Sequence, residues 1–283
     1  MAGKWILTAA HCSGDGGSYV EFANHDSLPT KNKINHPDYM SDGVDVALWE
    51  LPSLANTVAI SFLSMRNVEL GEDIVITGFG AGTENPLKGL EYATQNSLEQ
   101  FEGLGARKLE LINIGRGGVL AGDSGSPMLD VDGLIVAVTA TGGSGVGVGA
   151  GGTRLYFARD FILDTIKGWH YPTLAKTTNG SVMIEVQSLH SASFMDNATT
   201  NGDVTITGGS CVAKIVEPFD ICTYEISSAN GYEGTLVLDD GESIVVNKGK
   251  AEPTPDSGGD SGGSMGWISL LVLAGVRKFG LSR

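Results

Sequence analysis

Ser124 occurs in a setting that suits a nucleophile. The run Gly122-Asp123-Ser124-Gly125 has glycines around the serine, which let the backbone turn tightly and approach a carbonyl without a Cβ in the way. A hydroxyl is a poor nucleophile at neutral pH. Hydrolysis through serine therefore requires a base, a carboxylate that orients the base, and backbone N–H groups facing the developing oxyanion. Taken alone, the run is equally compatible with an ordinary turn.

A histidine and an aspartate occur in settings that suit the other two roles. His11 ends the apolar run 5–10, although a histidine at a strand end is more often structural. Asp45 enters the apolar run 46–51, where a carboxylate is costly to bury unless it is hydrogen-bonded. This context predicts that hydrogen bonds hold the carboxylate of Asp45. Asp38 and Asp42 do not enter the apolar run, and their side chains are predicted to be solvated.

Three motifs occur together in one order along the chain. They are T-A-A-H-C at 8–12, H-P-x-Y at 36–39 followed by D-V-A-L at 45–48, and G-D-S-G-S-P at 122–127. The ordered set resembles the signatures of trypsin-like (chymotrypsin-fold) serine proteases. The run 71–80 also resembles the strand and turn that open the second barrel of that family. The resemblance extends from residue 1 to about residue 168.

The resemblance implies a role for each of these residues. His11 would be the general base and later the general acid, and Asp45 would orient it. Ser124 would attack the peptide carbonyl and form an acyl-enzyme, while the N–H groups of Gly122 and Ser124 would form the oxyanion hole. Substrates would be proteins or peptides, and neither a cofactor nor a metal is expected.

The chain departs from the family at its beginning. Family members start well before T-A-A-H-C, and their released N-terminus pairs with the residue that is Asp123 here. We therefore expect an N-terminally incomplete domain in which Asp123 lacks its cation and the first barrel exposes unpaired edges. Cys12 would normally bond to an upstream cysteine, and Leu120 replaces a cysteine that brackets the specificity pocket.

Substrate preference is weakly encoded. Gly118 stands where trypsin carries the aspartate that binds Arg or Lys, so a strict preference for basic residues is not expected. The glycine-rich run 142–152 is predicted to form a pocket wall, or alternatively a surface loop.

The composition and the short apolar runs of the chain predict an all-β protein. Among 283 residues, 41 are glycine and 18% are charged, which is typical of many short strands joined by tight turns. Spacing at Phe157, Phe161 and Ile166 predicts one helix within 155–169. We expect a chymotrypsin-like double β-barrel over 1–168, with an incomplete first barrel and a terminal helix. The predicted strands are 5–10, 44–51, 57–62, 74–79, 109–114 and 134–140.

A second domain is predicted over 173–248. Strands are expected at 181–186, 203–207, 222–227, 234–238 and 243–246, and they fit a small β-sandwich. The segment resembles immunoglobulin-like modules of bacterial surface proteins. Cys211 and Cys222 could form a disulfide, and two free buried thiols are the alternative.

The C-terminal segment resembles a sorting signal. A Gly/Ser/Asp-rich linker over 249–263 precedes an apolar segment and a basic end within 264–283. This resembles the GlyGly-CTERM tail of Gram-negative bacteria, in which a rhomboid-like protease cuts near the glycines, here Gly262 and Gly263, after type II secretion. A hydrophobic helix would tether the precursor to the inner membrane before display or release, and an amphipathic or core segment is the alternative. The whole chain resembles secreted Vibrio-type trypsin-like proteases.

The charge balance limits the possible partners. The formal net charge is −15, from 18 basic and 33 acidic side chains, which does not suit nucleic-acid binding. The chain opens without a signal peptide, which alone would suggest a cytoplasmic protein, but the tail argues for export. Three functions therefore stay open: an exported serine endopeptidase, a catalytically inactive fragment or surface-binding module, and a nonfunctional gene remnant.

Overall fold

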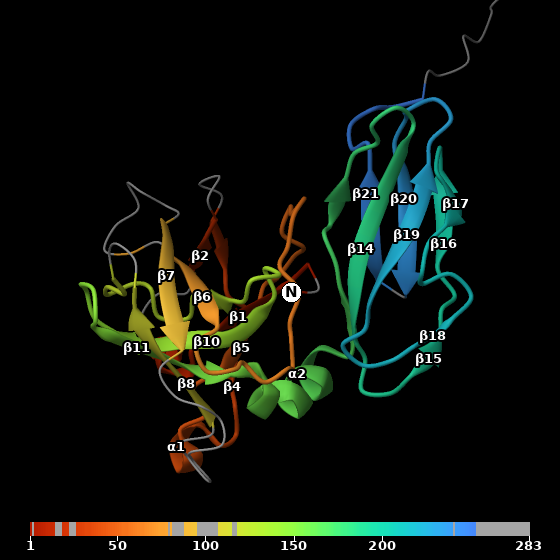
Figure 1. The fold of residues 1–283 in the computed structure, drawn as a ribbon. Coiled ribbons are helices and arrows are strands. Elements are labelled where there is room, and N and C mark those ends of the chain that lie inside the picture. The colour runs from red at the N-terminus through yellow and green to blue at the C-terminus, as the bar shows by residue number, and fades with distance from the viewer. Residues whose placement is uncertain are drawn as a thin grey trace, which may run out of the picture. The chain divides into compact units, whose positions relative to one another are not determined.

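The computed structural model is mostly β and forms a chymotrypsin-like fold followed by two four-stranded sheets and a two-stranded one (Figure 1). Residues Met1–Ala251 form one compact unit. No helix within the described ranges is long and apolar enough to span a membrane. The expected sorting tail, including Gly262 and Gly263, lies outside the described residues. The structure describes residues 1, 3–14, 19–22, 27–78, 80, 88–94, 107–114, 118–239 and 241–252.

The first half carries a three-stranded antiparallel sheet in the order β1-β5-β4. A hairpin of β2 and β3 accompanies it. Within the described residues this half does not close into a barrel. The elements are β1 (Trp5–Thr8), η1 (Ala10–Ser13), β2 (Tyr19–Glu21), β3 (Ser27–Pro29), β4 (Asn32–Asn35), α1 (Tyr39–Asp42) and β5 (Ala47–Glu50).

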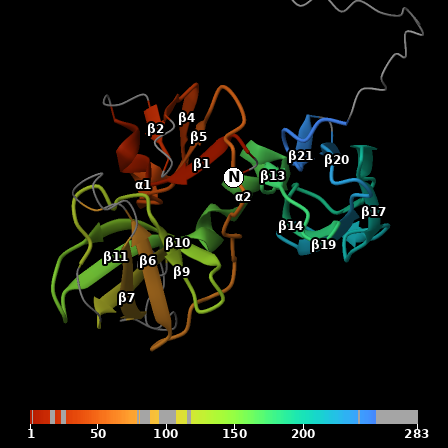
Figure 2. The same ribbon diagram turned by 90° about the horizontal axis from the view of Figure 1, so that it is seen from above.

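The second half is a closed antiparallel barrel in the order β10-β11-β8-β7-β6-β9, and Figure 2 shows it as a group separate from β1, β4 and β5. Burial alternates along β6, so that Ile74 and Ile76 enter the barrel core while their neighbours face outward. The strands are β6 (Asp73–Gly78), β7 (Lys88–Thr94), β8 (Lys108–Asn113), β9 (Pro127–Leu129), β10 (Ile135–Gly142) and β11 (Gly149–Arg154).

One expectation for this part of the chain was wrong. Residues 57–62 form no strand, because their backbone bonds go singly to different segments: Leu174 N–H donates to Thr57 O, and Ile135 N–H donates to Phe62 O. The helix expected within 155–169 is confirmed, but it is shorter and in two parts, η4 (Leu155–Ala158) and α2 (Arg159–Ile166). The helix ends there because Lys167 takes a left-handed conformation with φ 51°.

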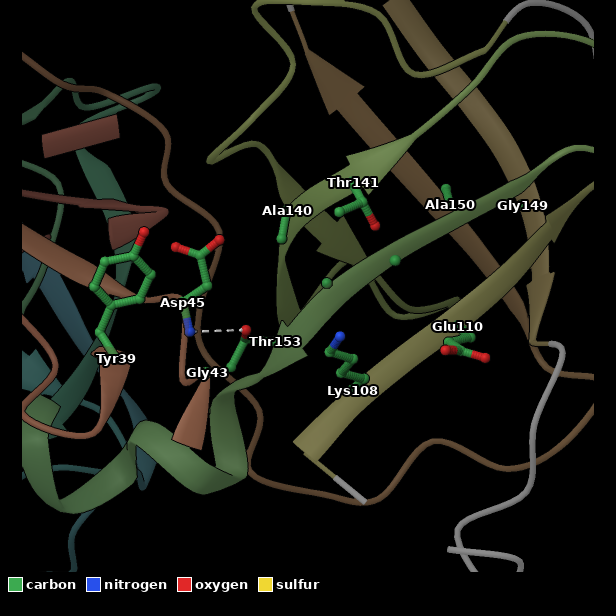
Figure 3. A pocket seen from close by; sticks show the side chains of 12 residues that line it. Tyr39, Gly43, Asp45, Lys108, Glu110, Ala140, Thr141, Gly149, Ala150 and Thr153 are labelled. Atoms are coloured by element: carbon green, nitrogen blue, oxygen red, sulfur yellow. Dashed lines mark hydrogen bonds between the residues drawn. The ribbon is translucent and has the colours of Figure 1, made fainter. Parts of the chain in front are cut away.

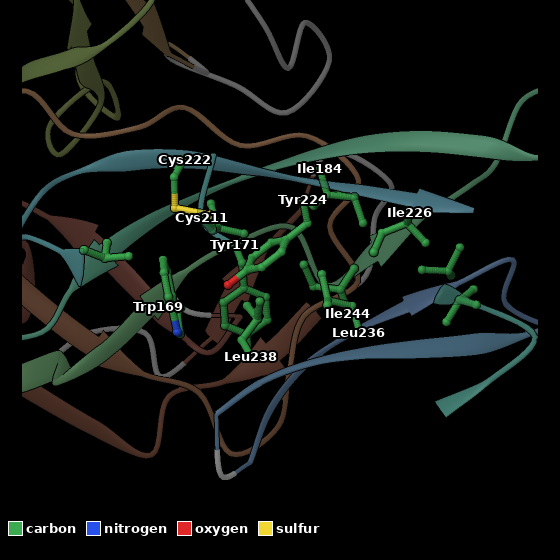
Figure 4. Close-up of a cluster of buried hydrophobic side chains, with 14 of the residues drawn as sticks. Trp169, Tyr171, Ile184, Cys211, Cys222, Tyr224, Ile226, Leu236, Leu238 and Ile244 are labelled. Atoms are coloured by element: carbon green, nitrogen blue, oxygen red, sulfur yellow. A yellow bond between two sulfur atoms is a disulfide. The ribbon is translucent and has the colours of Figure 1, made fainter. Parts of the chain in front are cut away.

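The remaining sheets pack around a shared apolar core. One has the order β12-β14-β19-β17 and the other β13-β21-β20-β16, and β15 pairs with β18. Figure 4 shows Trp169, Tyr171 and Tyr224 in this core beside the Cys211–Cys222 disulfide, which confirms the expected pairing. The strands are β12 (Gly168–His170), β13 (Leu174–Ala175), β14 (Ser181–Leu189), β15 (Phe194–Met195), β16 (Thr199–Gly202), β17 (Thr205–Gly208), β18 (Ile215–Val216), β19 (Ile221–Ser227), β20 (Gly234–Asp239) and β21 (Glu242–Val246).

Candidate active site

His11 lies in the short helical turn that follows β1. Ala9 and Ala10 just before it are buried, which anchors the turn and leaves the imidazole at the surface. The His11 Nδ1 atom lies 2.6 Å from Asp45 Oδ2, and the His11 backbone N–H donates to Asp45 Oδ1 at 2.9 Å. One carboxylate thus binds both the ring and the backbone of the histidine, which fixes the ring's orientation.

Asp45 is held where the two halves of the fold meet. Its neighbours Val44 and Val46 are buried, and its own side chain is 16% exposed. The Asp45 backbone N–H donates to Thr153 Oγ1 on β11 at 3.2 Å, the bond drawn in Figure 3. The second barrel therefore helps to position the carboxylate that holds His11.

Ser124 lies in a tight turn stabilised from both sides. Asp123 N–H donates to Leu120 O, and Ser126 N–H donates to Asp123 O, each at 3.0 Å. Gly122 and Gly125 have φ of 97° and 86°, a region that disfavours residues with a Cβ. The half-buried serine is thereby presented at the tip of the turn.

The serine turn packs against the strand that leads to His11. A Cβ on Gly125 would lie 2.2 Å from Thr8 Oγ1 and 3.1 Å from the Ala9 nitrogen, so only glycine permits this approach. Gly125 N–H also donates to Thr139 O at 2.8 Å. The structure thus brings the serine turn next to the histidine segment.

Hydrogen bonding joins His11 to Asp45 but not to Ser124. Among the described residues, the structure records no hydrogen bond to the Ser124 hydroxyl. Such contacts in unliganded enzymes are often long and tighten when substrate binds. The backbone N–H groups of Gly122 and Ser124 likewise donate no bond within the described part of the chain.

Asp123 is fully buried, and backbone amides bind its carboxylate. Gly80 N–H donates to Oδ1 at 2.6 Å, and Leu120 N–H donates to Oδ2 at 2.8 Å. We expected a buried carboxylate without its cation. The amide donors found here satisfy both oxygens with charge-assisted hydrogen bonds.

Gly118 is closely packed against the segment that follows β10. It forms an antiparallel bridge with Ser144, and Val119 N–H donates to Gly143 O at 3.0 Å. A Cβ at position 118 would lie 2.2 Å from Ser144 Cα. The backbone therefore excludes an aspartate at this position, in agreement with the glycine in the sequence.

A pocket of about 480 Å³ lies beside Asp45, between Tyr39 on one side and strands β8, β10 and β11 on the other (Figure 3). Several of its residues come from the glycine-rich run, but Lys108, Glu110 and Thr153 carried no recognisable signal in the sequence. The lining comprises Tyr39, Gly43, Asp45, Lys108, Glu110, Ala140, Thr141, Gly149, Ala150, Gly151, Gly152 and Thr153.

Cys12, directly after His11, is a free and half-buried thiol. Burial raises its pKa, which keeps the sulfur protonated and weakly nucleophilic. No group of three or more His, Cys, Asp or Glu side chains in the described ranges could hold a metal ion.

A two-part β fold with a His–Asp pair beside a glycine-flanked serine turn defines a chymotrypsin-like protease fold. The sequence profile of the trypsin family matches residues 1–162, and the chain belongs to that family. No curated protein matches its sequence.

Solved structures of proteases are similar in fold. The VesB protease of Vibrio cholerae has a TM-score of 0.46 and 15% identity, covering 86% of each chain. The secreted serine protease VesC of Vibrio cholerae has a TM-score of 0.44 and 14% identity, over 86% of this chain and 63% of that one. Mouse neuropsin, a serine protease, has a TM-score of 0.49 and 21% identity, over 58% of this chain and 85% of that one.

Proposed function

We propose that this protein is a serine endopeptidase in which Ser124, His11 and Asp45 form the catalytic triad. The observation that carries the proposal is the pair of hydrogen bonds from His11 to the Asp45 carboxylate, on a segment packed against the Ser124 turn. Membership of the trypsin family supports hydrolysis of peptide bonds as the reaction.

In the proposed reaction each of these groups has one role. Ser124 Oγ attacks the carbonyl carbon of the substrate while its proton passes to His11 Nε2, and Asp45 stabilises the charged imidazole. The N–H groups of Gly122 and Ser124 donate to the oxyanion of the tetrahedral intermediate. His11 then gives the proton to the departing amine and leaves an ester on Ser124. Water, activated by the same imidazole, hydrolyses this acyl-enzyme.

We further propose that the enzyme is exported. The support is the sequence of the tail, with its glycine pairs, apolar segment and basic end, together with the Ig-like character of 173–248. A rhomboid-like protease would cut near Gly262 and Gly263 after type II secretion and end the membrane tether. The intact mass of the protein recovered outside the cell tests this, since a mass that includes residues 264–283 contradicts cleavage.

Covalent labelling tests the catalytic proposal. A fluorophosphonate reacts only with an activated serine, so the 283-residue chain is expected to be labelled at Ser124 and to cleave a denatured protein substrate. Ser124→Ala should lose both properties, whereas Ser126→Ala, two residues away, should be labelled. Absence of labelling in the folded wild-type chain would support the alternative of an inactive, surface-binding protein.

A further inference from the structure

The segment 55–63, between β5 of the first sheet and β6 of the barrel, is bound by residues from the other end of the chain. These residues belong to, or adjoin, the two four-stranded sheets that follow α2, hereafter the C-terminal sheets. Thr173 Oγ1 donates to Ala55 O at 2.7 Å. His170 Nε2 donates to Ser61 O at 3.0 Å. The segment that connects the two halves of the protease fold is therefore held from outside both halves.

Leu63, the last residue of this segment, is bound on both sides of its backbone by one side chain. The amide of Gln187 on β14 accepts from Leu63 N–H at 2.9 Å and donates to Leu63 O at 2.7 Å. Both residues are buried. Backbone groups buried away from water are costly to leave without partners, so this pair of bonds fixes the position of Leu63.

Leu63 in turn fixes the start of β10. It forms a parallel bridge with Ile135, the first residue of that strand. Ile135 N–H donates to Phe62 O, and Ile135 O accepts from Ser64 N–H, each at 2.8 Å. The residues on both sides of Leu63 thus bind one residue of the barrel.

The same strand holds the serine turn. Thr139, four residues after Ile135 on β10, accepts from Gly125 N–H at 2.8 Å and donates its own N–H to Ser126 O at 2.9 Å. Gly125 and Ser126 are the two residues that follow Ser124. A displacement of β10 would therefore move the turn that carries the nucleophile.

The side chain of Leu63 also shares a buried cluster with the other two catalytic segments. The cluster includes Ala9, two residues before His11, and Val46, the residue after Asp45. The side chains of Leu63, Ala9 and Val46 are each 2% exposed or less. Because protein interiors are close-packed and transmit strain, a shift of Leu63 displaces the neighbours that anchor the His–Asp pair.

We propose that Gln187 is a positioning residue for the catalytic triad and acts through Leu63. The proposal rests on the proposed protease function. It makes the C-terminal sheets part of the catalytic unit, because one of their side chains sets the position of a residue that contacts the segments of His11, Asp45 and Ser124. A misplacement of about 1 Å far from the chemistry can cost on the order of 100-fold in rate, so a small shift has a measurable effect.

The rate of fluorophosphonate labelling of the 283-residue chain tests this proposal. The second-order rate constant, divided by the folded fraction from circular dichroism, reports the alignment of Ser124 with His11, whereas lost stability changes only the folded fraction. Gln187→Met keeps the length of the side chain but removes both hydrogen bonds to Leu63. It should lower this corrected rate constant about tenfold or more. In peptide hydrolysis it should lower kcat and kcat/KM equally and leave KM unchanged.

Two further variants separate positioning from stability. Leu236 on β20 is fully buried in a core cluster that does not include Leu63, so Leu236→Ala should destabilise the chain but keep the wild-type corrected rate constant. Leu63→Val removes one methylene from the proposed link and costs less stability than Gln187→Met. It should fold and lower the corrected rate constant about threefold.

The outcomes distinguish this proposal from the protease proposal. If Ser124 is labelled but Gln187→Met keeps the wild-type corrected rate constant, the positioning proposal is wrong and the protease proposal stands. The same conclusion follows if Leu236→Ala lowers that constant as much as Gln187→Met. If Gln187→Met does not fold, Leu63→Val decides, and a wild-type constant there overturns the positioning proposal. Failure of the wild-type chain to be labelled overturns both.

Discussion

Individual side chains show how burial changes chemistry that the sequence leaves unspecified. Glu242 on β21 accepts a hydrogen bond from Trp169 N–H at 2.9 Å, and its carboxyl covers Gly168 so closely that a Cβ there would lie 2.4 Å from Oε1. The pKa of Glu242 is raised to about 7, mainly by burial and also by the nearby charge of Asp239, against the opposing effects of the Trp169 N–H and Lys4.

Glu242→Gln is expected to change how stability depends on pH. Because the folded pKa of Glu242 lies above its ordinary value of 4.5, the folded protein binds this proton more tightly than the unfolded chain. Its favourable contribution is complete below about pH 4.5 and is lost as the pH rises through about 7. Gln keeps the acceptor without a charge, so the variant should be more stable than wild type at pH 8 and similar at pH 4.5.

Urea unfolding at several pH values measures this difference. The exposed Glu217 provides a matched control, and Glu217→Gln should follow the wild-type curve. A constant difference between Glu242→Gln and wild type across pH 4.5–8 would contradict a raised pKa at Glu242.

A buried carboxylate joins a turn of the second barrel to the segment before it. The pattern of apolar and polar residues in the sequence did not predict this contact. Asp130, in the turn between β9 and β10, has a fully buried carboxylate. It accepts hydrogen bonds from Arg66 Nε and Nη2 at 2.9 and 2.8 Å, and from the backbone N–H groups of Asp132 and Leu134. The segment before β6 is thereby tied to this turn.

Asp130→Ala should destabilise the barrel by about 3 kcal/mol, because it leaves two amide donors without their acceptor and removes one of the two carboxylates that bind Arg66, the other being Glu72. Asp132→Ala, at an exposed neighbouring position, should change the free energy of unfolding by about 0.5 kcal/mol or less. Chemical denaturation measures both, and equal effects of the two substitutions would argue against the buried network.

The chain from Met1 to Ala251 is joined by contacts between segments far apart in sequence. Gln187 on β14 is buried, and its amide both accepts from Leu63 N–H at 2.9 Å and donates to Leu63 O at 2.7 Å. It also donates to Phe219 O at 3.1 Å. One side chain thus satisfies backbone groups that lie 124 and 32 positions away in the sequence.

Gln187→Ala is expected to lower the free energy of unfolding by about 3 kcal/mol, since it leaves buried backbone groups of Leu63 and Phe219 without partners. Glu185→Ala on the same strand, at an exposed position, should have little effect. Chemical unfolding measured by circular dichroism should show one transition, and Gln187→Ala should move its midpoint to a lower denaturant concentration. Two separate transitions in the wild-type chain would show that its halves unfold independently.

The sequence alone determined features that depend on neighbouring residues. The apolar run 74–79 predicted the strand that is β6, and the spacing of Cys211 and Cys222 indicated the disulfide that the structure contains. Motif order indicated the trypsin family, and glycines around Ser124 indicated a tight turn. The strand expected over 57–62 was wrong, because its apolar pattern carried no information on where its backbone bonds would go.

Only the tertiary structure decided what lies between distant segments. It joined His11 to Asp45 across 34 positions, gave Asp123 its amide donors, and opened the pocket beside Ala140. It also raised the pKa of Glu242. The physical reason is that periodicity and turn propensity are properties of consecutive residues, whereas desolvation, pocket volume and side-chain pairing depend on which strands the fold places against one another.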